Sequence, residues 1–297
     1  MWTRSASLWP ELPYEAWRDT RHTLHMYLQI VGKLRLALAP MEPQWAQVPL
    51  YVTARGLNTS PIPHSADVFD VDVDLVDHVV SVRTTRGRVE RVRLEPRTVA
   101  DFYAELMGAL DRAGVPVEIT TTPTEVPNRT PYPKDVEHSS YEPEWANRFW
   151  HVLVSVDAVM KEHRARFRGK ASPVHFFWGS FDVAYTRFSG RLLEPPTGTD
   201  VITRYGQDAE QASAGFWPGD DTVREPIFFA YRWPKPDGIE AAELQPEAAG
   251  WNPELGEFVL PYEAVRTAPD PRQALLDFLE TTYRAGAERA SWPPELG

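Results

Sequence analysis

The sequence contains no cysteine among its 297 residues. This absence excludes disulfide bonds, thiolate metal ligands and a cysteine nucleophile. The chain also has no run of about 20 apolar residues, the length that a membrane-spanning helix requires. The first residues, MWTRSASLWPELPYEAW, lack the apolar core of a secretory signal. We therefore expect a cytoplasmic protein with no membrane partner.

Positive charge is scarce relative to negative charge, with 31 Lys and Arg against 42 Asp and Glu and a net charge of −11. Nucleic acids are bound by clustered Lys and Arg, so no nucleic-acid partner is expected. The signatures of phosphate-binding loops, dinucleotide-binding folds, serine hydrolases and helical zinc proteases are also absent. Any chemistry must therefore come from looser groupings of side chains.

Tryptophan, in contrast, is abundant, with 11 residues, and large rings beside polar groups are common in ligand sites. Aromatic residues are concentrated in residues 173–191, PVHFFWGSFDVAYTRFSGR. We predict one long central strand here, kinked at Gly179 and Ser180, because a glycine inside a strand often marks a bulge.

Hydrophobic periodicity predicts the same order of elements twice: a helix, antiparallel strands and a second helix. The first set has helices at 14–39 and 97–113 around strands at 49–55, 68–76, 79–85 and 88–94. The second has helices at 143–168 and 271–290 around strands at 173–191, 227–233 and 257–260. His25 precedes Leu50 by 25 residues, and His151 precedes Phe176 by the same number. The sequence thus predicts an α+β fold of two pseudo-repeated halves, packed together after an internal duplication.

The domain boundaries follow from this pattern. Residues 1–114 would form the first half, and residues 143–297 the second, with a long insertion at about 192–250. Between them, residues 115–142 are rich in proline and lack periodicity, which is typical of a linker. A cleft between two such halves is the expected position for a small polar or aromatic ligand.

Five residues are predicted to bind this ligand. They are His25 of the first helix, Trp178, Asp182 and Arg187 of the central strand, and Trp217 of a Gly-Phe-Trp-Pro-Gly turn that would cover the ligand. Trp217 could instead pin the insertion to the core. Asp182 is the candidate catalytic residue, because a carboxyl group among aromatic rings either needs a cationic partner or becomes an acid or base with a raised pKa. Arg187 or Arg191 is the alternative partner, in a structural ion pair.

Two other functions stay open. His22 and His25 project from one helix face, and with His151 they could bind a divalent transition metal such as Zn, Fe or Mn. Asp182 or His175 could complete the site of a metal-assisted hydrolase. Histidine pairs on helix surfaces are also common without a metal. In the third interpretation, the protein is a structural or interaction protein whose aromatic residues all belong to the core.

Four strings resemble an uncharacterised bacterial family known only as a domain of unknown function. They are TLH at 23–25 with GK at 32–33, FWGSFDVAYTRFSGR at 177–191, SAGFWPG at 213–219 and LPYEAVR at 260–266. The resemblance runs over essentially the whole chain and implies that the chain is one family unit. It implies no activity, cofactor or catalytic residue.

Overall fold

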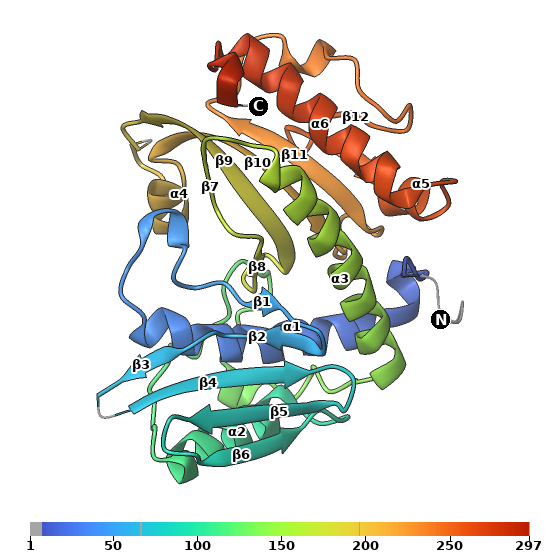
Figure 1. Ribbon diagram of the computed structural model, residues 1–297. Coiled ribbons are helices and arrows are strands. Elements are labelled where there is room, and N and C mark those ends of the chain that lie inside the picture. The colour runs from blue at the N-terminus through green and yellow to red at the C-terminus, as the bar shows by residue number, and fades with distance from the viewer. Residues whose placement is uncertain (1–7, 66, 196, 297) are drawn as a thin grey trace.

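The computed structural model describes residues 8–65, 67–195 and 197–296 (Figure 1). Two antiparallel sheets, each with helices against one face, form two packed halves, so the predicted α+β class is confirmed. In Figure 1 the first sheet (blue to teal) lies below the second (yellow to orange). None of the described helices is both long and apolar enough to span a membrane.

The first half begins with helix α1 (Tyr14–Leu38) and ends with α2 (Val99–Ala113). Its sheet has the order β1-β2-β4-β5-β6, and β3 also pairs with β4. The strands are β1 (Tyr51–Val52), β2 (Gly56–Asn58), β3 (Ile62–His64), β4 (Asp67–Asp74), β5 (Val79–Thr84) and β6 (Val89–Arg93). Helix α2 packs on β5 and β6. Thr98 accepts a hydrogen bond from the Asp101 N–H at its start, and Gly114 ends it with a φ of 78°.

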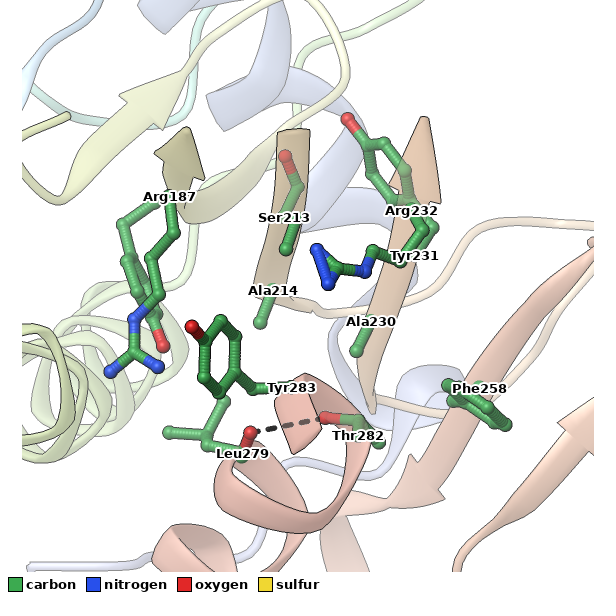
Figure 2. A pocket seen from close by; sticks show the side chains of 12 residues that line it. Arg187, Ser213, Ala214, Ala230, Tyr231, Arg232, Phe258, Leu279, Thr282 and Tyr283 are labelled. Atoms are coloured by element: carbon green, nitrogen blue, oxygen red, sulfur yellow. Dashed lines mark hydrogen bonds between the residues drawn. The ribbon is translucent and has the colours of Figure 1, made fainter. Parts of the chain in front are cut away.

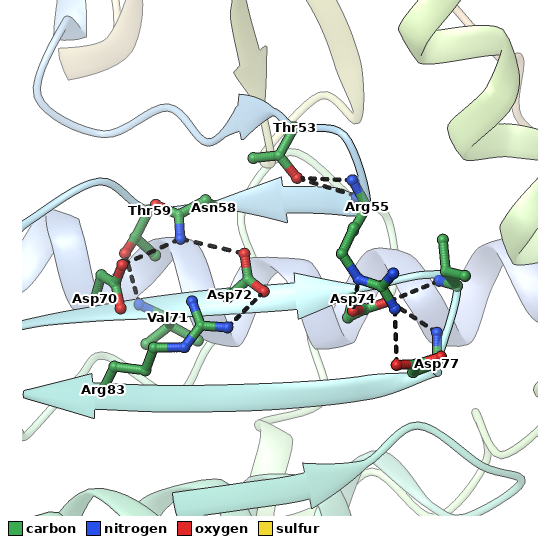
Figure 3. A network of polar contacts seen from close by, with 12 residues as sticks. Thr53, Arg55, Asn58, Thr59, Asp70, Val71, Asp72, Asp74, Asp77 and Arg83 are labelled. Atoms are coloured by element: carbon green, nitrogen blue, oxygen red, sulfur yellow. Dashed lines mark hydrogen bonds and ion pairs between the residues drawn. The ribbon is translucent and has the colours of Figure 1, made fainter. Parts of the chain in front are cut away.

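The opposite face of the first sheet is a network of paired charges (Figure 3). Arg83 lies 3.2 Å from Asp72, and Arg55 lies 2.5 Å from Asp74 and 2.7 Å from Asp77. The alternation of apolar and acidic residues along β4 places Val71 and Val73 in the core and the aspartates on this open face.

The second half runs from helix α3 (Pro143–Ala165) to α6 (Pro271–Arg289). Its sheet has the order β12-β13-β11-β10-β9-β7, and β8 also pairs with β9. Helix α3 packs on β9, and α6 packs on β10 and β11. The remaining elements are β7 (Lys170–Ala171), β8 (His175–Phe177), β9 (Asp182–Leu192), α4 (Val201–Gly206), β10 (Ala209–Trp217), β11 (Ile227–Trp233), β12 (Gly250–Asn252), β13 (Glu257–Pro261) and α5 (Tyr262–Arg266).

The predicted central strand is a hairpin, so the kink at Gly179 and Ser180 is wrong. Strand β8 pairs antiparallel with β9, with Phe177 opposite Asp182. The four residues between them turn the chain back, and the Phe181 N–H donates to the Phe177 carbonyl at 2.8 Å. Phe181 has a φ of 64°, an uncommon conformation for a bulky residue. Aromatic residues occupy both strands of the hairpin, so the hydrophobicity pattern gives no sign of the turn between them.

The predicted insertion is more regular than expected, because besides the predicted strand at 227–233, which is β11, it supplies the central strand β10. Trp217 is the last residue of β10, paired with Ile227, and not part of a loop. Small residues such as Ala212, Ala214 and Gly215 give β10 a weak hydrophobic pattern, which explains why the sequence did not predict this strand.

The two halves meet at an isolated antiparallel bridge between Leu50 and Phe176. Each N–H donates to the carbonyl of the other residue at 2.9 Å. These are the positions that follow His25 and His151 by the same spacing. A twofold axis generates contacts in which equivalent residues of the two halves make the same hydrogen bonds to each other. The reciprocal bridge is therefore expected if the halves are pseudo-repeats.

Candidate functional site

A cavity of about 970 Å³ lies over the face of the second sheet that α3 and α6 leave uncovered. Its floor comes from β9, β10, β11 and β13. The first half contributes Leu36, Gln44, Trp45 and Val48 to the walls, and the Pro-rich segment contributes Thr124 and Glu125. Helix α4 closes one side, where Trp45 donates a hydrogen bond to the Ile202 carbonyl at 3.0 Å. We call this space the cleft.

Strand register places a row of polar side chains on the floor of the cleft. Thr186 on β9, Ser213 on β10 and Tyr231 on β11 are direct neighbours, and the Thr186 and Ser213 hydroxyls are 2.7 Å apart. Glu257 follows on β13, one residue beyond the pair of Ala230 with Phe258. The intervening residues of each strand point to α3 and α6, because side chains alternate across a sheet.

Seven aromatic rings complete the lining. They are Trp45, Phe177, Trp178, Trp217, Phe229, Tyr231 and Trp233. Most come from the second sheet, and only Trp45 comes from the first half. Rings with a few polar groups among them are the usual lining of small-molecule sites.

The turn between β8 and β9 is fixed from below by α1. His25 is buried, and its Nε2–H donates to the carbonyls of Trp178 and Gly179 at 2.9 and 3.0 Å. Burial lowers the pKa of His25 to about 3, so the ring is neutral at neutral pH. The Trp178 indole donates to the Val48 carbonyl at 2.9 Å and lies against Gly32, where a Cβ would be 2.1 Å from the ring. Gly32 is therefore required for this ring position.

Asp182 follows this turn and faces the cleft with only 8% of its surface exposed. Ser180 donates a hydrogen bond to its Oδ1, and no other residue in the described part of the chain pairs with its carboxyl group. Burial raises its pKa to about 7, and the nearby charge of Glu125 adds to the effect. Asp182 is thus poised to gain or lose a proton near neutral pH.

Two further carboxyl groups line the cleft, and the sequence analysis missed both. Burial and the charge of Asp182 raise the pKa of Glu257 to about 7. The surrounding protein and the charge of Asp200 raise the pKa of Glu125, which lies at the accessible rim. Neither the Glu257 nor the Glu125 carboxyl group has a hydrogen bond or an ion pair among the described residues.

Glu125 is held in place through a chain of buried polar contacts. The Gln29 side chain of α1 exchanges two hydrogen bonds with the Thr124 backbone, each of 2.8 Å. The next residue, Glu125, then lies against Gly179, where a Cβ would be 2.1 Å from its Oε2. The segment predicted as a linker is therefore a wall of the site.

The comparison with known families matches a single model over residues 9–296. The chain belongs to a family of unknown function, DUF5996. No curated protein and no solved structure matches it.

Two of the four strings quoted in the sequence analysis meet at the β8–β9 turn. TLH and GK of α1 supply His25 and Gly32, and the long aromatic string supplies Trp178, Gly179 and Asp182. Trp217, from a third string, lies one residue beyond the Phe216–Val183 pair, beside Asp182. Three of the four strings in this DUF5996 chain thus supply residues at one wall of the cleft.

Of the predicted ligand-binding residues, Trp178, Asp182 and Trp217 line the cleft, and His25 lies behind it as a support. Arg187 does not face the cleft. It lies on the other side of the sheet (Figure 2), donates to the His163 carbonyl at 2.5 Å and stacks 4.3 Å from the Tyr283 ring centre. Side chains alternate between the two faces of a strand, so Arg187, five residues after Asp182, points to the opposite face of the sheet. The proposed ion pair of Asp182 with Arg187 or Arg191 is therefore wrong, and Arg191 pairs with Glu210.

The proposed metal ligands are not gathered at one place. His22 lies 3.3 Å from Asp221 and contacts Tyr14, His25 is bonded to backbone carbonyls, and His151 stacks on Trp150. Among the residues that the structure describes, no group of three His, Asp or Glu side chains is arranged to hold a metal ion. The separate helices α1 and α3 direct these histidines to different surroundings.

Proposed function

We propose that this protein binds a small organic ligand in the cleft between its two halves. The observation that carries the proposal is a large open cavity whose floor holds two carboxyl groups, Asp182 and Glu257, that lie among seven aromatic rings and have no cationic partner among the residues that the structure describes. Buried polar groups without partners cost stability. A fold that keeps them at the floor of a cavity is better explained by a ligand than by structure alone. This also disfavours the purely structural interpretation of the aromatic residues.

A second candidate function is acid–base catalysis on the bound ligand, with Asp182 as the catalytic residue. The specific observation is a pKa of about 7 for both Asp182 and Glu257, raised chiefly by burial, to which the charge of Glu125 adds at Asp182 and the charge of Asp182 adds at Glu257. Groups that titrate near the working pH transfer protons most effectively. The metal-assisted hydrolase is not pursued, because His22, His25 and His151 do not converge.

A thermal-shift screen of small molecules against three proteins tests the proposal. Ala184→Trp fills the floor of the cleft, Trp217→Ala removes part of its lining, and Leu192→Ala changes an 86% exposed residue outside it. A ligand at about 100 times its Kd should stabilise the wild type by about 2.7 kcal/mol. We expect this shift in Leu192→Ala and its loss in both cleft variants. Hits that persist in both cleft variants would place binding elsewhere and contradict the proposal.

A further inference from the structure

Three acidic residues line the cleft. Asp182, Glu257 and Glu125 come from three separate segments and face the same space. Their charges act on one another: Glu125 raises the pKa of Asp182, and Asp182 raises that of Glu257. Groups this close repel when ionised, so these carboxyl groups give the cleft a negative potential.

The two basic residues that touch the cleft do not neutralise these acids. Lys235 lies 3.3 Å from Glu240 and 5.4 Å from the Trp251 ring centre. The Arg232 guanidinium stacks 3.9 Å from the Trp292 ring centre, on the helix side of the sheet. Each cation therefore has its favourable contact away from Asp182.

Asp182 is the member of the set that most needs a partner. It is more than nine-tenths buried and faces the cleft, and among the described residues Ser180 is the one other residue that donates to its side chain, beside the backbone N–H of Asp182 itself. When ionised, a carboxylate in this position requires a cation or several hydrogen-bond donors. The described chain supplies neither, which leaves the ligand as the source.

The aromatic rings point to the same kind of ligand. Trp217 lies beside Asp182 on the neighbouring strand, and Trp178 lines the cleft from the turn that precedes Asp182. The face of an aromatic ring carries negative electrostatic potential and attracts cations, with indole the strongest of the side chains. Carboxylates among indoles thus combine two independent attractions for one positive group.

We infer that the ligand of the cleft carries an ammonium group, as a protonated or quaternary amine, attached to an apolar or aromatic body. The inference rests on the proposed function. The ammonium group lies near Asp182 and Trp217, Glu257 adds long-range attraction from β13, and the rings of β11 cover the body of the ligand.

Three probes that share an indole ring and differ in charge test this inference. Tryptamine is cationic, tryptophol neutral and indole-3-acetate anionic. Affinities are measured by calorimetry at pH 8, where the carboxyl groups are ionised. Because a unit charge several ångströms away in a partly buried site changes the affinity substantially, we expect tryptamine to bind at least about tenfold tighter than tryptophol. Indole-3-acetate should bind most weakly.

Single variants assign the effect to the carboxyl groups. Asp182→Asn and Glu257→Gln should each weaken tryptamine by about tenfold and leave tryptophol within about twofold. Glu263→Gln, at an exposed side chain on α5, is the matched control for net charge and should change neither affinity. The Asn and Gln side chains keep the shape of the originals, and the melting temperature of each variant reports its folding.

The outcomes separate the two levels of the proposal. Preference for tryptamine that is lost in Asp182→Asn supports the ammonium ligand. Equal or tighter binding of tryptophol or indole-3-acetate, with loss in Trp217→Ala, would overturn the ammonium inference and leave the ligand-binding proposal standing. Absence of binding by all three probes, or binding that Trp217→Ala and Ala184→Trp both leave unchanged, would overturn both.

Discussion

The two halves share an order of elements, yet the pKa values of acidic residues shift in opposite directions on the open faces of their sheets. On the first sheet, burial alone would raise the pKa of Asp74, but hydrogen bonds from Arg55 and from the Asp77 and Val76 N–H groups outweigh it and lower the pKa. On the second sheet, Asp182 has no cationic partner within the described ranges, and burial raises its pKa to about 7. Paired acids stabilise a fold, whereas unpaired ones cost stability and are retained where function needs them.

The largest expected effect comes from Gly32, which makes room for the ring beneath the cleft. In Gly32→Ala the new Cβ would collide with Trp178, so we expect a loss of about 3 kcal/mol in the free energy of unfolding. Gly108→Ala in α2 is the matched control. Its Cβ would meet only the flexible end of Arg112, and alanine should stabilise that helix by up to about 1 kcal/mol. Urea denaturation measures both, and equal effects would contradict the packing that we describe.

His25 and His151 occupy matched positions in the two halves and should differ in their contributions to stability. His25→Ala leaves the Trp178 and Gly179 carbonyls without their donor, at an expected cost of about 2–3 kcal/mol. His151 is half-buried, and within the described residues its side chain makes only a ring contact with Trp150. His151→Ala should therefore lower the free energy of unfolding by less than about 1 kcal/mol. Denaturation midpoints compare them, and a larger loss in His151→Ala would refute this contrast.

The same substitution should have opposite signs on the two sheets. A folded-state pKa above the unfolded value means that the stability from protonated Asp182 is present below about pH 4 and is lost as the pH rises through 7. Asp182→Asn should therefore stabilise the protein by about 2 kcal/mol at pH 8 and by little at pH 4. Asp74→Asn loses the Arg55 pair and should destabilise by about 1–2 kcal/mol at pH 8. Destabilisation by Asp182→Asn at pH 8 would show that Asp182 has a structural partner.

The smallest effect is expected for an exposed ion pair of the first sheet. Arg83 is about half exposed and lies 3.2 Å from Asp72. Arg83→Gln should change the free energy of unfolding by less than about 0.5 kcal/mol, and the difference should shrink in high salt. A loss above about 1 kcal/mol in thermal unfolding would mean that the network of Figure 3 is cooperative.

Much of the architecture could be predicted because local signals mark it. The capping residues around α2 and the Asp270-Pro271 start of α6 predicted those helices within about two residues of their bounds. The alternation along β4 predicted its buried face. The position of Arg187 could also have been predicted, because strict alternation from Asp182 places it on the opposite face.

Other parts of the site depend on contacts that no local pattern encodes. Glu125 lies in a segment without periodicity and reaches the cleft because Gln29 binds the backbone of Thr124. Glu257 was recognised as a strand residue, but its nearness to Asp182 depends on how the sheet brings β9 and β13 together across β10 and β11. The hairpin turn at Trp178–Phe181 uses a positive φ at a phenylalanine, which sequence propensity disfavours.

The most direct test of the contrast between the two sheets is a titration of side-chain carboxyl groups by carbon-13 NMR, assigned with Asp182→Asn, Glu257→Gln and Asp74→Asn. The account predicts that Asp182 and Glu257 titrate with pKa values near 7, and that Asp74 titrates below the ordinary aspartate range near 4. Titration of Asp182 and Glu257 near 4 would show that the protein already compensates their charges, and would contradict the account.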